Sequence, residues 1–216
     1  TLGLVHLTKL IARDEIGDPD ITRRLKAARL IPLAKPDGGV RPIAIGEIFP
    51  RIAAGVVCRA LSAEIRDFLG PRQFAAPGYK AGAEALVHTT RALVEVKPHF
   101  LTVKIDIRNA FNCVDRIALL RALEDNSALH GLLPYFTFAY LTQSDLRVPQ
   151  PRDAEGRRVA DVVIASETGV KQGDPAAMAF FCIAMQDLYA ELEVILKNDR
   201  GHMLAFADDG YIVGPQ

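Results

Sequence analysis

Residues 101–107 alternate strictly between apolar and polar side chains, and this run constrains the fold more than any other feature. A period of two is typical of a β-strand that buries one face. The aliphatic residues are expected on one face, and Thr102, Lys104 and Asp106 on the other. Aspartate is unfavourable inside a strand. Asp106 therefore indicates either a local hydrogen bond or a functional site, and these residues alone leave both open.

A second acidic feature lies near the end of the sequence. Asp208-Asp209-Gly210 stands between two short apolar runs, 202–207 and 211–213, and Asp-Gly between apolar runs is the signal of a tight hairpin. An Asp pair at a hairpin usually only forms the turn. Its position matters here, because a crossover helix between neighbouring strands would bring the end of strand 101–107 beside this tip.

Helical patterns surround these strands, over 83–96, 115–123 and 131–141. A longer helix is expected from Gly173 to about Lys197, with Asp174 as its N-cap and Pro175 at its first position. This mixture predicts the α+β class: an antiparallel sheet with helices packed on one face.

The first third of the chain contains a second hairpin prediction, over residues 30–45. Two strand-like runs flank Pro36-Asp37-Gly38-Gly39, which is a strong turn signal. Lys35 and Arg41 lie next to this turn. A single helix is expected to follow over 48–69.

Composition excludes several classes of protein. The 216 residues are half apolar and 24% charged, as in globular proteins and unlike disordered or fibrous chains. No apolar run reaches the ~18 residues of a membrane span, so no membrane partner is expected.

The three cysteines lie far apart and outside any Cys/His cluster. This spacing disfavours a disulfide framework or a zinc site and fits a reducing, intracellular compartment.

The formal net charge of zero hides an asymmetry along the chain. Residues 1–59 contain ten Lys/Arg and six Asp/Glu, whereas residues 151–216 contain six and eleven. The first segment could meet phosphates and the last could collect cations. Two solvated faces explain the same counts, because proteins that bind polyanions usually show a larger excess.

The three aspartates point to chemistry on phosphates if the fold brings them together. Two or three carboxylates within a few Å repel each other, and a divalent cation removes that repulsion. Mg²⁺ prefers carboxylate oxygens together with substrate phosphates. Two such ions about 4 Å apart form the clamp used for in-line phosphoryl transfer.

Four segments, in this order, resemble the motifs of the right-hand-palm reverse transcriptases. They are Leu33-Ala-Lys-Pro-Asp-Gly-Gly39 with Arg41-Pro-Ile43, then Asp106-Ile-Arg-Asn-Ala-Phe111-Asn112, then Gly169-Val-Lys-Gln-Gly-Asp-Pro175, and finally Phe206-Ala-Asp-Asp209. Gln73-Phe74 with Gly78 is similar to the segment that connects fingers and palm. The resemblance covers about residues 28–214 and is closest to the enzymes of non-LTR retrotransposons, with group II intron enzymes next.

The resemblance implies a fingers and palm fold. Residues 1–75 would be a fingers-like segment and residues 76–216 the palm with fingers insertions, truncated after the Asp-Asp hairpin. The thumb is expected to be absent, and a fragment without a thumb can be inactive on its own. The implied activity is that of an RNA-directed DNA polymerase of a mobile element.

The resemblance also assigns the metal ligands. Asp106 and Asp208 would bind two Mg²⁺ ions, for which Mn²⁺ can substitute, with the backbone carbonyl of Ile107 as a further ligand. Asp209 would support the metal site. Together these residues would add dNTPs to a primer 3′-hydroxyl by two-metal phosphoryl transfer.

Nucleotide contacts follow from the same motifs. Lys35 and Arg41 would hold the triphosphate, and Gln172 would sit beside the incoming sugar and the base pair. Gly173 would let the backbone approach the nucleotide. Phe111 would lie under the sugar and reject a 2′-hydroxyl, so that dNTPs are selected.

Partners and compartment are implied in the same way. RNA template, DNA primer and dNTPs are expected, along with the rest of a larger polyprotein, including a thumb and possibly an endonuclease. A nuclear location follows if the element is a eukaryotic retrotransposon.

Two alternatives remain at this point. A viral RNA-dependent RNA polymerase would carry Gly before Asp-Asp and a second Asp in the first motif. Ala207 and Phe111 occupy those positions, which argues against it. The other alternative is a non-catalytic relic or nucleic-acid-binding scaffold derived from a reverse transcriptase. Loss of the metal carboxylates would mark such a relic, and Asp106, Asp208 and Asp209 are all present.

Overall fold

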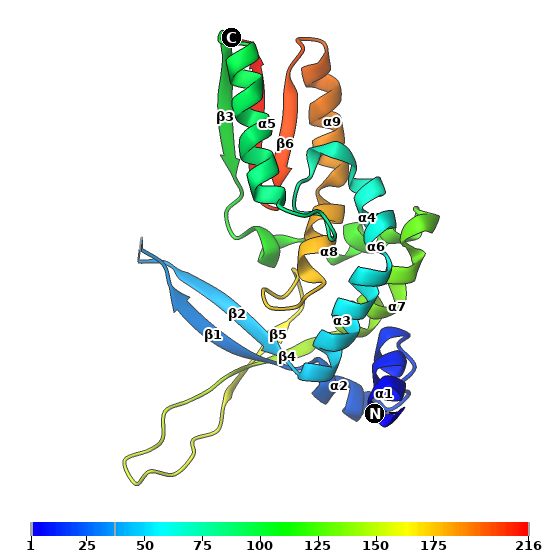
Figure 1. Ribbon diagram of the computed structural model, residues 1–216. Coiled ribbons are helices and arrows are strands. Elements are labelled where there is room, and N and C mark those ends of the chain that lie inside the picture. Colours follow the sequence, from blue (N-terminus) through cyan, green and yellow to red (C-terminus); the bar gives the residue numbers. More distant parts are fainter. Residues whose placement is uncertain (1, 37, 216) are drawn as a thin grey trace.

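Two separate β-sheets are joined by a layer of helices (Figure 1). The computed structural model describes residues 2–36 and 38–215. Asp37, part of the expected turn in the first hairpin, lies outside the described residues. No helix of the described chain is long and apolar enough to cross a membrane.

The first sheet carries the expected N-terminal hairpin. It contains β1 (Ala28–Ala34), β2 (Val40–Gly46), β4 (Ser144–Val148) and β5 (Val162–Ser166), in the order β2-β1-β4-β5. β1 pairs with β2 antiparallel and with β4 parallel. The β1–β2 hairpin and the long connection between β4 and β5 diverge from a common base (Figure 1).

The second sheet is antiparallel, as expected. It contains β3 (Phe100–Asp106), β7 (Asp209–Pro215) and β6 (His202–Phe206), in the order β3-β7-β6. The α+β class with an antiparallel sheet is therefore confirmed.

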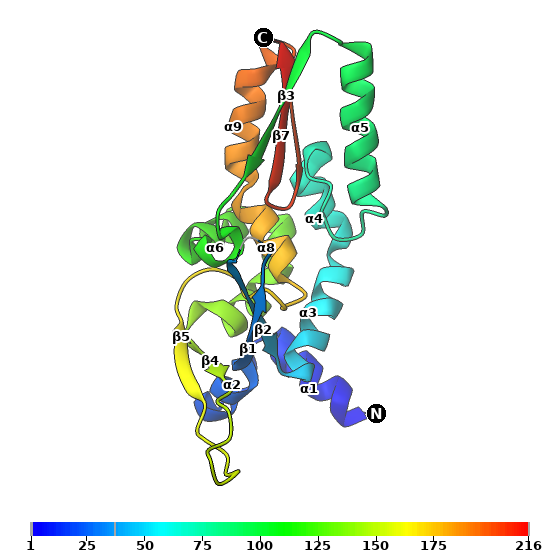
Figure 2. The ribbon, with the colours of Figure 1, turned by 90° about the vertical axis from the view of Figure 1, so that its left-hand side faces the viewer.

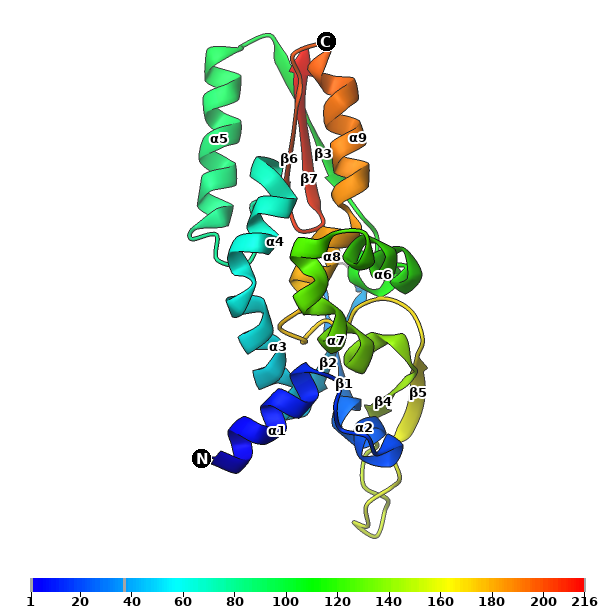
Figure 3. The same ribbon diagram turned by 90° about the vertical axis from the view of Figure 1, so that its right-hand side faces the viewer.

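The expectation that helices cover only one face of this sheet is corrected. Leu204 of β6 packs with Leu86 of α5 (Gly82–Val96). The adjacent Met203 packs with Tyr189 of α9 (Gln186–Lys197). Successive strand residues point to opposite faces, so α5 and α9 lie on opposite sides, as Figures 2 and 3 show. Apolar residues on both faces of β6 explain why each face needs its own helix.

The turn of the C-terminal hairpin lies one step earlier than its sequence signal indicated. Ala207 and Asp208 form the turn, and Asp209 and Gly210 already belong to β7. Ala207 has a φ of +54°. A Cβ on Gly210 would lie 3.1 Å from Met203 Cε and 3.4 Å from Ile105 Cβ. Gly210 therefore serves close packing within the strand, and the Asp-Gly pair misplaces the turn.

The helical layer between the sheets contains the main apolar core. Its largest fully buried side chains are aromatic and come from the segment after α6 and from α8: Phe136, Phe138, Tyr140, Phe180 and Phe181. The helices of this layer are α1 (Leu2–Ala12), α2 (Pro19–Lys26), α3 (Ile48–Ala60), α4 (Ser62–Leu69), α6 (Arg116–Glu124), α7 (Leu133–Phe136) and α8 (Ala177–Ala184). The short helical turns are Gly70–Arg72, Ala110–Cys113, Ser127–Leu132 and the π-turn Thr137–Leu141.

Two expected helices are each divided in two. The predicted helix over 48–69 breaks at Leu61, between α3 and α4. The predicted helix from Gly173 starts only at Ala177 and breaks at Met185, between α8 and α9. Asp174 does accept a hydrogen bond from the Ala176 N–H at 2.9 Å, but it does not cap a helix that begins at Pro175.

Arg116 of α6 connects the helical layer with the end of β5 and the loop that follows it. It is 8% exposed, and its guanidinium donates to the carbonyl oxygens of Gly169, Tyr140, Ser166 and Thr168 at 2.8 to 3.1 Å. Nη2 also donates to Ser166 Oγ at 2.9 Å. A buried carbonyl without a partner is costly, so this one side chain makes the path of residues 166–169 possible.

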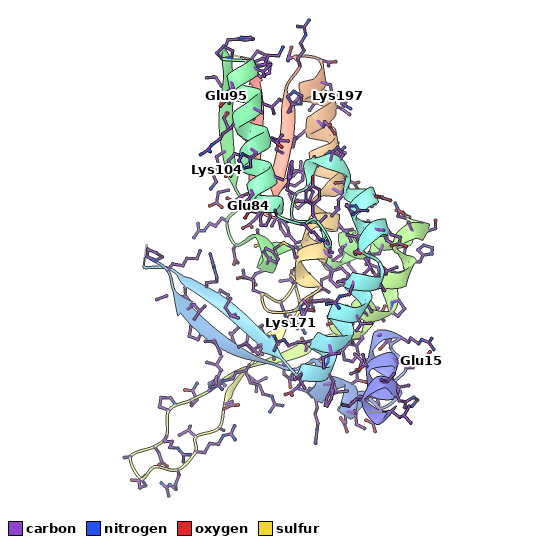
Figure 4. All side chains as sticks on the ribbon, viewed as in Figure 1. Glu15, Glu84, Glu95, Lys104, Lys171 and Lys197 are labelled. Carbon is purple, nitrogen blue, oxygen red and sulfur yellow. The ribbon has the colours of Figure 1, made fainter. Side chains whose placement is uncertain are left out.

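A polar network extends from the same junction. The hydroxyls of Tyr135 and Tyr140 donate to the Asp174 carboxylate at 3.2 and 2.6 Å. Burial raises the pKa of Asp174 and lowers the pKa of Lys171 to about 8. Lys171 Nζ donates to the Lys26 carbonyl at 3.1 Å, where the first sheet meets the helical layer (Figure 4).

Replacing Arg116 is expected to destabilise the fold. Arg116→Lys removes the forked geometry and leaves several buried carbonyls unpaired, at a cost of about 3 kcal/mol in the free energy of unfolding. Urea unfolding followed by circular dichroism measures this change. Arg121→Lys, on the exposed side of the same helix, is the control and should stay within about 0.5 kcal/mol. Equal losses of unfolding free energy in the two variants would contradict this role of Arg116.

The buried amine predicts a pH dependence of stability. Below about pH 8 Lys171 is charged in both folded and unfolded chains and bears the full burial penalty. As pH rises from about 8 toward 10.5, the folded chain releases this proton first, so folding is favoured. Relative to Lys171→Met, the wild type should gain about 2 kcal/mol between pH 8 and pH 10. Chemical unfolding at a series of pH values measures the difference, and a flat difference would refute it.

Candidate active site

The three candidate aspartates lie at the same end of the second sheet. Asp106, the last residue of β3, lies directly opposite Asp209 of β7. Asp208 precedes Asp209 in the turn. Asp106 is exposed and the other two are half-buried, so all three side chains can reach a ligand from solvent. The end of strand 101–107 thus lies beside the hairpin tip, as the sequence predicted, but β7 lies between β3 and β6, so the crossover joins strands that are not neighbours.

Lys104 forms an ion pair with one of these carboxylates. Its Nζ lies 2.9 Å from Asp209 Oδ1, and the hydrogen bond and charge of Asp209 raise the pKa of Lys104. Lys104 extends from β3 (Figure 4). Asp106 is on the same strand, and the two share a face because they are two positions apart. Sequence reasoning gave this lysine no role.

The donor set suits a hard divalent cation. Carboxylate oxygens from two adjacent strands, with the carbonyl of Ile107 directly after β3, are the ligand types that Mg²⁺ prefers. Within the described chain, no three His, Cys, Asp or Glu side chains are grouped closely enough to hold a metal. Among the described residues, Lys104 forms its ion pair with Asp209, whereas Asp106 and Asp208 form none. This division agrees with a supporting role for Asp209.

The turn that carries Asp208 is fixed from outside the hairpin. Gln73, 1% exposed, accepts from the Ala207 N–H at 2.9 Å and donates to the Ala207 carbonyl at 3.5 Å. Tyr189 of α9 donates to the same carbonyl at 3.3 Å. Phe74 N–H donates to Ala205 at 2.8 Å, which ties the backbone beside Gln73 to β6. Gln73 was noted only as part of a connecting segment, and nothing local in the sequence shows this contact.

The loop before α8 connects the aspartate strand with the first hairpin. Val170 N–H donates to the Phe111 carbonyl at 2.8 Å, and the Gln172 carbonyl accepts from the Ala44 N–H at 2.7 Å. Gly173 has a φ of +121°, and a Cβ there would lie 2.5 Å from the Ala44 carbonyl oxygen. Gly173 is thus required for its contact with β2. Gln172 lies beside it, half-buried.

Phe111 lies in the turn that follows Asp106 and Ile107. Its half-buried ring stacks on Phe181 of α8, with centroids 4.8 Å apart and planes 17° apart. The ring therefore has one side fixed by the core. This stacking gives the aromatic a defined orientation near the carboxylates.

Lys35 and Arg41 lie near the tip of the β1–β2 hairpin. Both are exposed, and in the part of the chain that the structure describes neither side chain forms an ion pair. Arg41 is opposite Leu33 in the strand register. The structure does not bring these two cations into contact with the aspartates.

Comparisons with known proteins agree with this arrangement. The family model described as reverse transcriptase (RNA-dependent DNA polymerase) matches residues 33–216. The retrotransposable element SLACS 132 kDa protein of Trypanosoma brucei gambiense is 29% identical over 113 residues, 50% of this chain and 9% of that protein. The Pol polyprotein of the type-1 retrotransposable element R2 of Popillia japonica is 26% identical over 181 residues, 78% of this chain and 24% of that protein.

Solved telomerase structures share the fold. Telomerase from Candida albicans, in complex with a fragment of telomeric RNA, has a TM-score of 0.63 at 13% identity and covers 92% of this chain and 39% of that one. Apo telomerase from Candida tropicalis has a TM-score of 0.61 at 12% identity, over 93% and 41% of the two chains.

The chain thus spans less than a quarter of the retrotransposon proteins that it matches. The family model covers most of its residues, the ordered motifs coincide with the aspartates that the fold brings together, and the relatives are of the non-LTR type. The chain belongs to the reverse transcriptase (RNA-dependent DNA polymerase) family.

Proposed function

We propose that this chain is the polymerising part of a larger retrotransposon protein and copies RNA into DNA. The observation that carries the proposal is the placement of Asp106 directly opposite Asp209, with Asp208 in a turn held by Gln73. The reaction is the transfer of a nucleotidyl group from a dNTP to a primer 3′-hydroxyl, with release of pyrophosphate. RNA template and DNA primer are the partners that this activity requires.

Asp106 and Asp208 would hold two Mg²⁺ ions, with Mn²⁺ as a substitute, and the Ile107 carbonyl would add a ligand. The ions supply charge neutralisation at the attacking and leaving oxygens. Asp209, paired with Lys104, would keep Asp208 oriented and balance the local charge. The fixed turn matters because a catalytic group displaced by about 1 Å can lose about 10²-fold in rate.

The nucleotide would lie between the hairpin and the aspartates. Lys35 and Arg41 are free of ion pairs in the described chain and would hold the triphosphate, with Arg41 suited to bidentate contact. Gln172 would contact the sugar and the base pair. Phe111, supported by Phe181, would block a 2′-hydroxyl and select dNTPs. Gly173 would bring the backbone close to the nucleotide as well as to β2.

In terms of polymerase anatomy, residues 1–75 would be fingers-like. Residues 76–216 would be palm with fingers insertions, of which the β4–β5 segment is one because it pairs with β1. The remaining length of the relatives would provide the thumb and other activities of the whole protein. A nuclear site of action is proposed for an element in a eukaryote.

Removing a metal carboxylate is expected to abolish incorporation. In primer extension on an RNA template with Mg²⁺ or Mn²⁺, the protein should add dNTPs and not rNTPs, and Asp106→Asn or Asp208→Asn should lower the rate by at least about 10³-fold. Asp67→Asn, a surface control whose side chain is 78% exposed, should keep full activity. If either variant still incorporates dNTPs, the substituted residue is not a metal ligand. If the wild-type sequence is inactive even in the full-length parent protein, the chain is a relic.

The support of the turn gives a second prediction. Gln73→Met keeps the size of the side chain but removes its bonds to Ala207, so kcat in primer extension should fall by about 10- to 100-fold. Gln186→Met is the matched control, because Gln186 is also buried but donates to Phe68, away from the aspartates. Thermal unfolding of both variants shows whether stability changes equally. Equal kcat values in the two variants would remove the positioning role.

A further inference from the structure

The loop before α8 contains a tight turn over residues 171–174. The Asp174 N–H donates to the Lys171 carbonyl at 3.0 Å, which makes this a β-turn with Gln172 and Gly173 at its centre. Gly173 has a φ of +121°, a conformation that favours glycine. In the part of the chain that the structure describes, no hydrogen bond holds the side-chain amide of Gln172. The centre of the turn therefore presents a polar group that is available to a ligand.

One hydroxyl connects the two ends of this turn. The hydroxyl of Tyr140 accepts from the Lys171 N–H at 3.3 Å and donates to the Asp174 carboxylate at 2.6 Å. The second distance is at the short end for an O–H···O hydrogen bond. Tyr135 also donates to the Asp174 carboxylate, at 3.2 Å, but it does not contact the first residue of the turn through a hydrogen bond. Tyr140 is thus the side chain that bonds to both ends.

Tyr140 itself is anchored by contacts outside the turn. It is 1% exposed and lies in the π-turn Thr137–Leu141, a rare conformation that is often found at functional sites. Its ring packs against Phe136 and Phe180, with centroids 5.9 and 5.7 Å away. Its carbonyl accepts from Arg116 at 3.1 Å. The core therefore fixes the hydroxyl, and the hydroxyl fixes the turn.

The backbone of the turn also contacts the first sheet. The Gln172 carbonyl accepts from the Ala44 N–H of β2 at 2.7 Å. Ala44 lines a small cavity together with Lys171 and Asp174, on the inner face of the sheet. Ile45, the next residue, points to the opposite, outer face. The turn is thus held between the core and the inner face, by bonds that leave the Gln172 amide unused.

We propose that Tyr140 is a positioning residue for the nucleotide site, whose hydroxyl holds the turn so that Gln172 meets the incoming dNTP. The inference rests on the proposed function, in which Gln172 contacts the sugar and the base pair. A loosened turn would leave the metal carboxylates in place, because Asp106 lies on β3 and Asp208 in the C-terminal hairpin. Loss of the hydroxyl should therefore weaken nucleotide binding without slowing the chemical step.

Primer extension on an RNA template, with the dNTP concentration varied, separates these two effects. Tyr140→Phe keeps the ring and removes the bridging hydroxyl, so KM for the dNTP should rise about tenfold while kcat changes less than about twofold. Tyr79→Phe is the control, because the Tyr79 hydroxyl forms no hydrogen bond in the described chain, and it should keep both constants. A loss of kcat at unchanged KM would mean that Tyr140 only stabilises the fold. That result, or equal increases of KM in the two variants, would overturn the proposal.

A double variant tests whether Tyr140 acts through Gln172. Gln172→Ala should itself raise KM for the dNTP by about tenfold. Combining it with Tyr140→Phe should raise KM no further, because both changes remove the same contact. If the two increases multiply instead, Tyr140 acts elsewhere and the proposal is wrong.

Hydrogen exchange at the Ala44 amide gives a readout that needs no activity. This N–H donates to the Gln172 carbonyl, so its exchange should be about tenfold faster in Tyr140→Phe and unchanged in Tyr79→Phe. Exchange at the wild-type rate in Tyr140→Phe would overturn the proposal.

Failure of the proposed function would look different. A wild type that adds no dNTP would refute the polymerase, and an unchanged KM in Gln172→Ala would refute the nucleotide contact of that residue. In either case the exchange rate at Ala44 would still decide whether the Tyr140 hydroxyl holds the turn.

Discussion

The fold depends on one buried guanidinium, that of Arg116, because it allows a loop with few backbone partners to cross the centre of the molecule. Four carbonyl oxygens from two segments converge on it. Without those donors the carbonyls would be buried and unpaired, and the loop would have to move toward water. That same loop bonds to Phe111 on one side and to Ala44 on the other. Arg116 thus satisfies the carbonyls at the start of the loop that contacts both Phe111 and the first hairpin.

The placement of Asp208 depends on the residue before it, Ala207, whose unfavourable backbone conformation is stabilised by hydrogen bonds from neighbouring residues. Ala207 has a positive φ, which is uncommon for a residue with a side chain. Gln73 and Tyr189 satisfy both polar groups of its backbone from two separate elements. The turn is therefore held from both sides, and the position of Asp208 depends on the packing of α9 and of the segment before α5.

Local signals predicted much of this structure. The strand at 101–107, the first hairpin and the helix at 83–96 were each indicated by period or by turn residues, and the ordered motifs identified the family. The errors share one cause, which is that distant contacts override local preference. The Asp174 carboxylate is held by two tyrosine hydroxyls, so its cap signal does not start a helix at Pro175. Gly210 fills a narrow space between strands and so does not form the turn. Gln73 and Arg116 act through residues far away in sequence, and no spacing rule reveals them.

The two faces of the first sheet differ in polarity because adjacent strand residues point toward different surroundings. On the inner face, Ala44 is small because the cavity beside Lys171 and Asp174 leaves little room. On the outer face, no layer of the described chain covers Arg29 and Arg147, so charge can accumulate there without a burial penalty. Arg41 is four residues from Ile45, so this cation of the hairpin lies on the outer face of β2 as well.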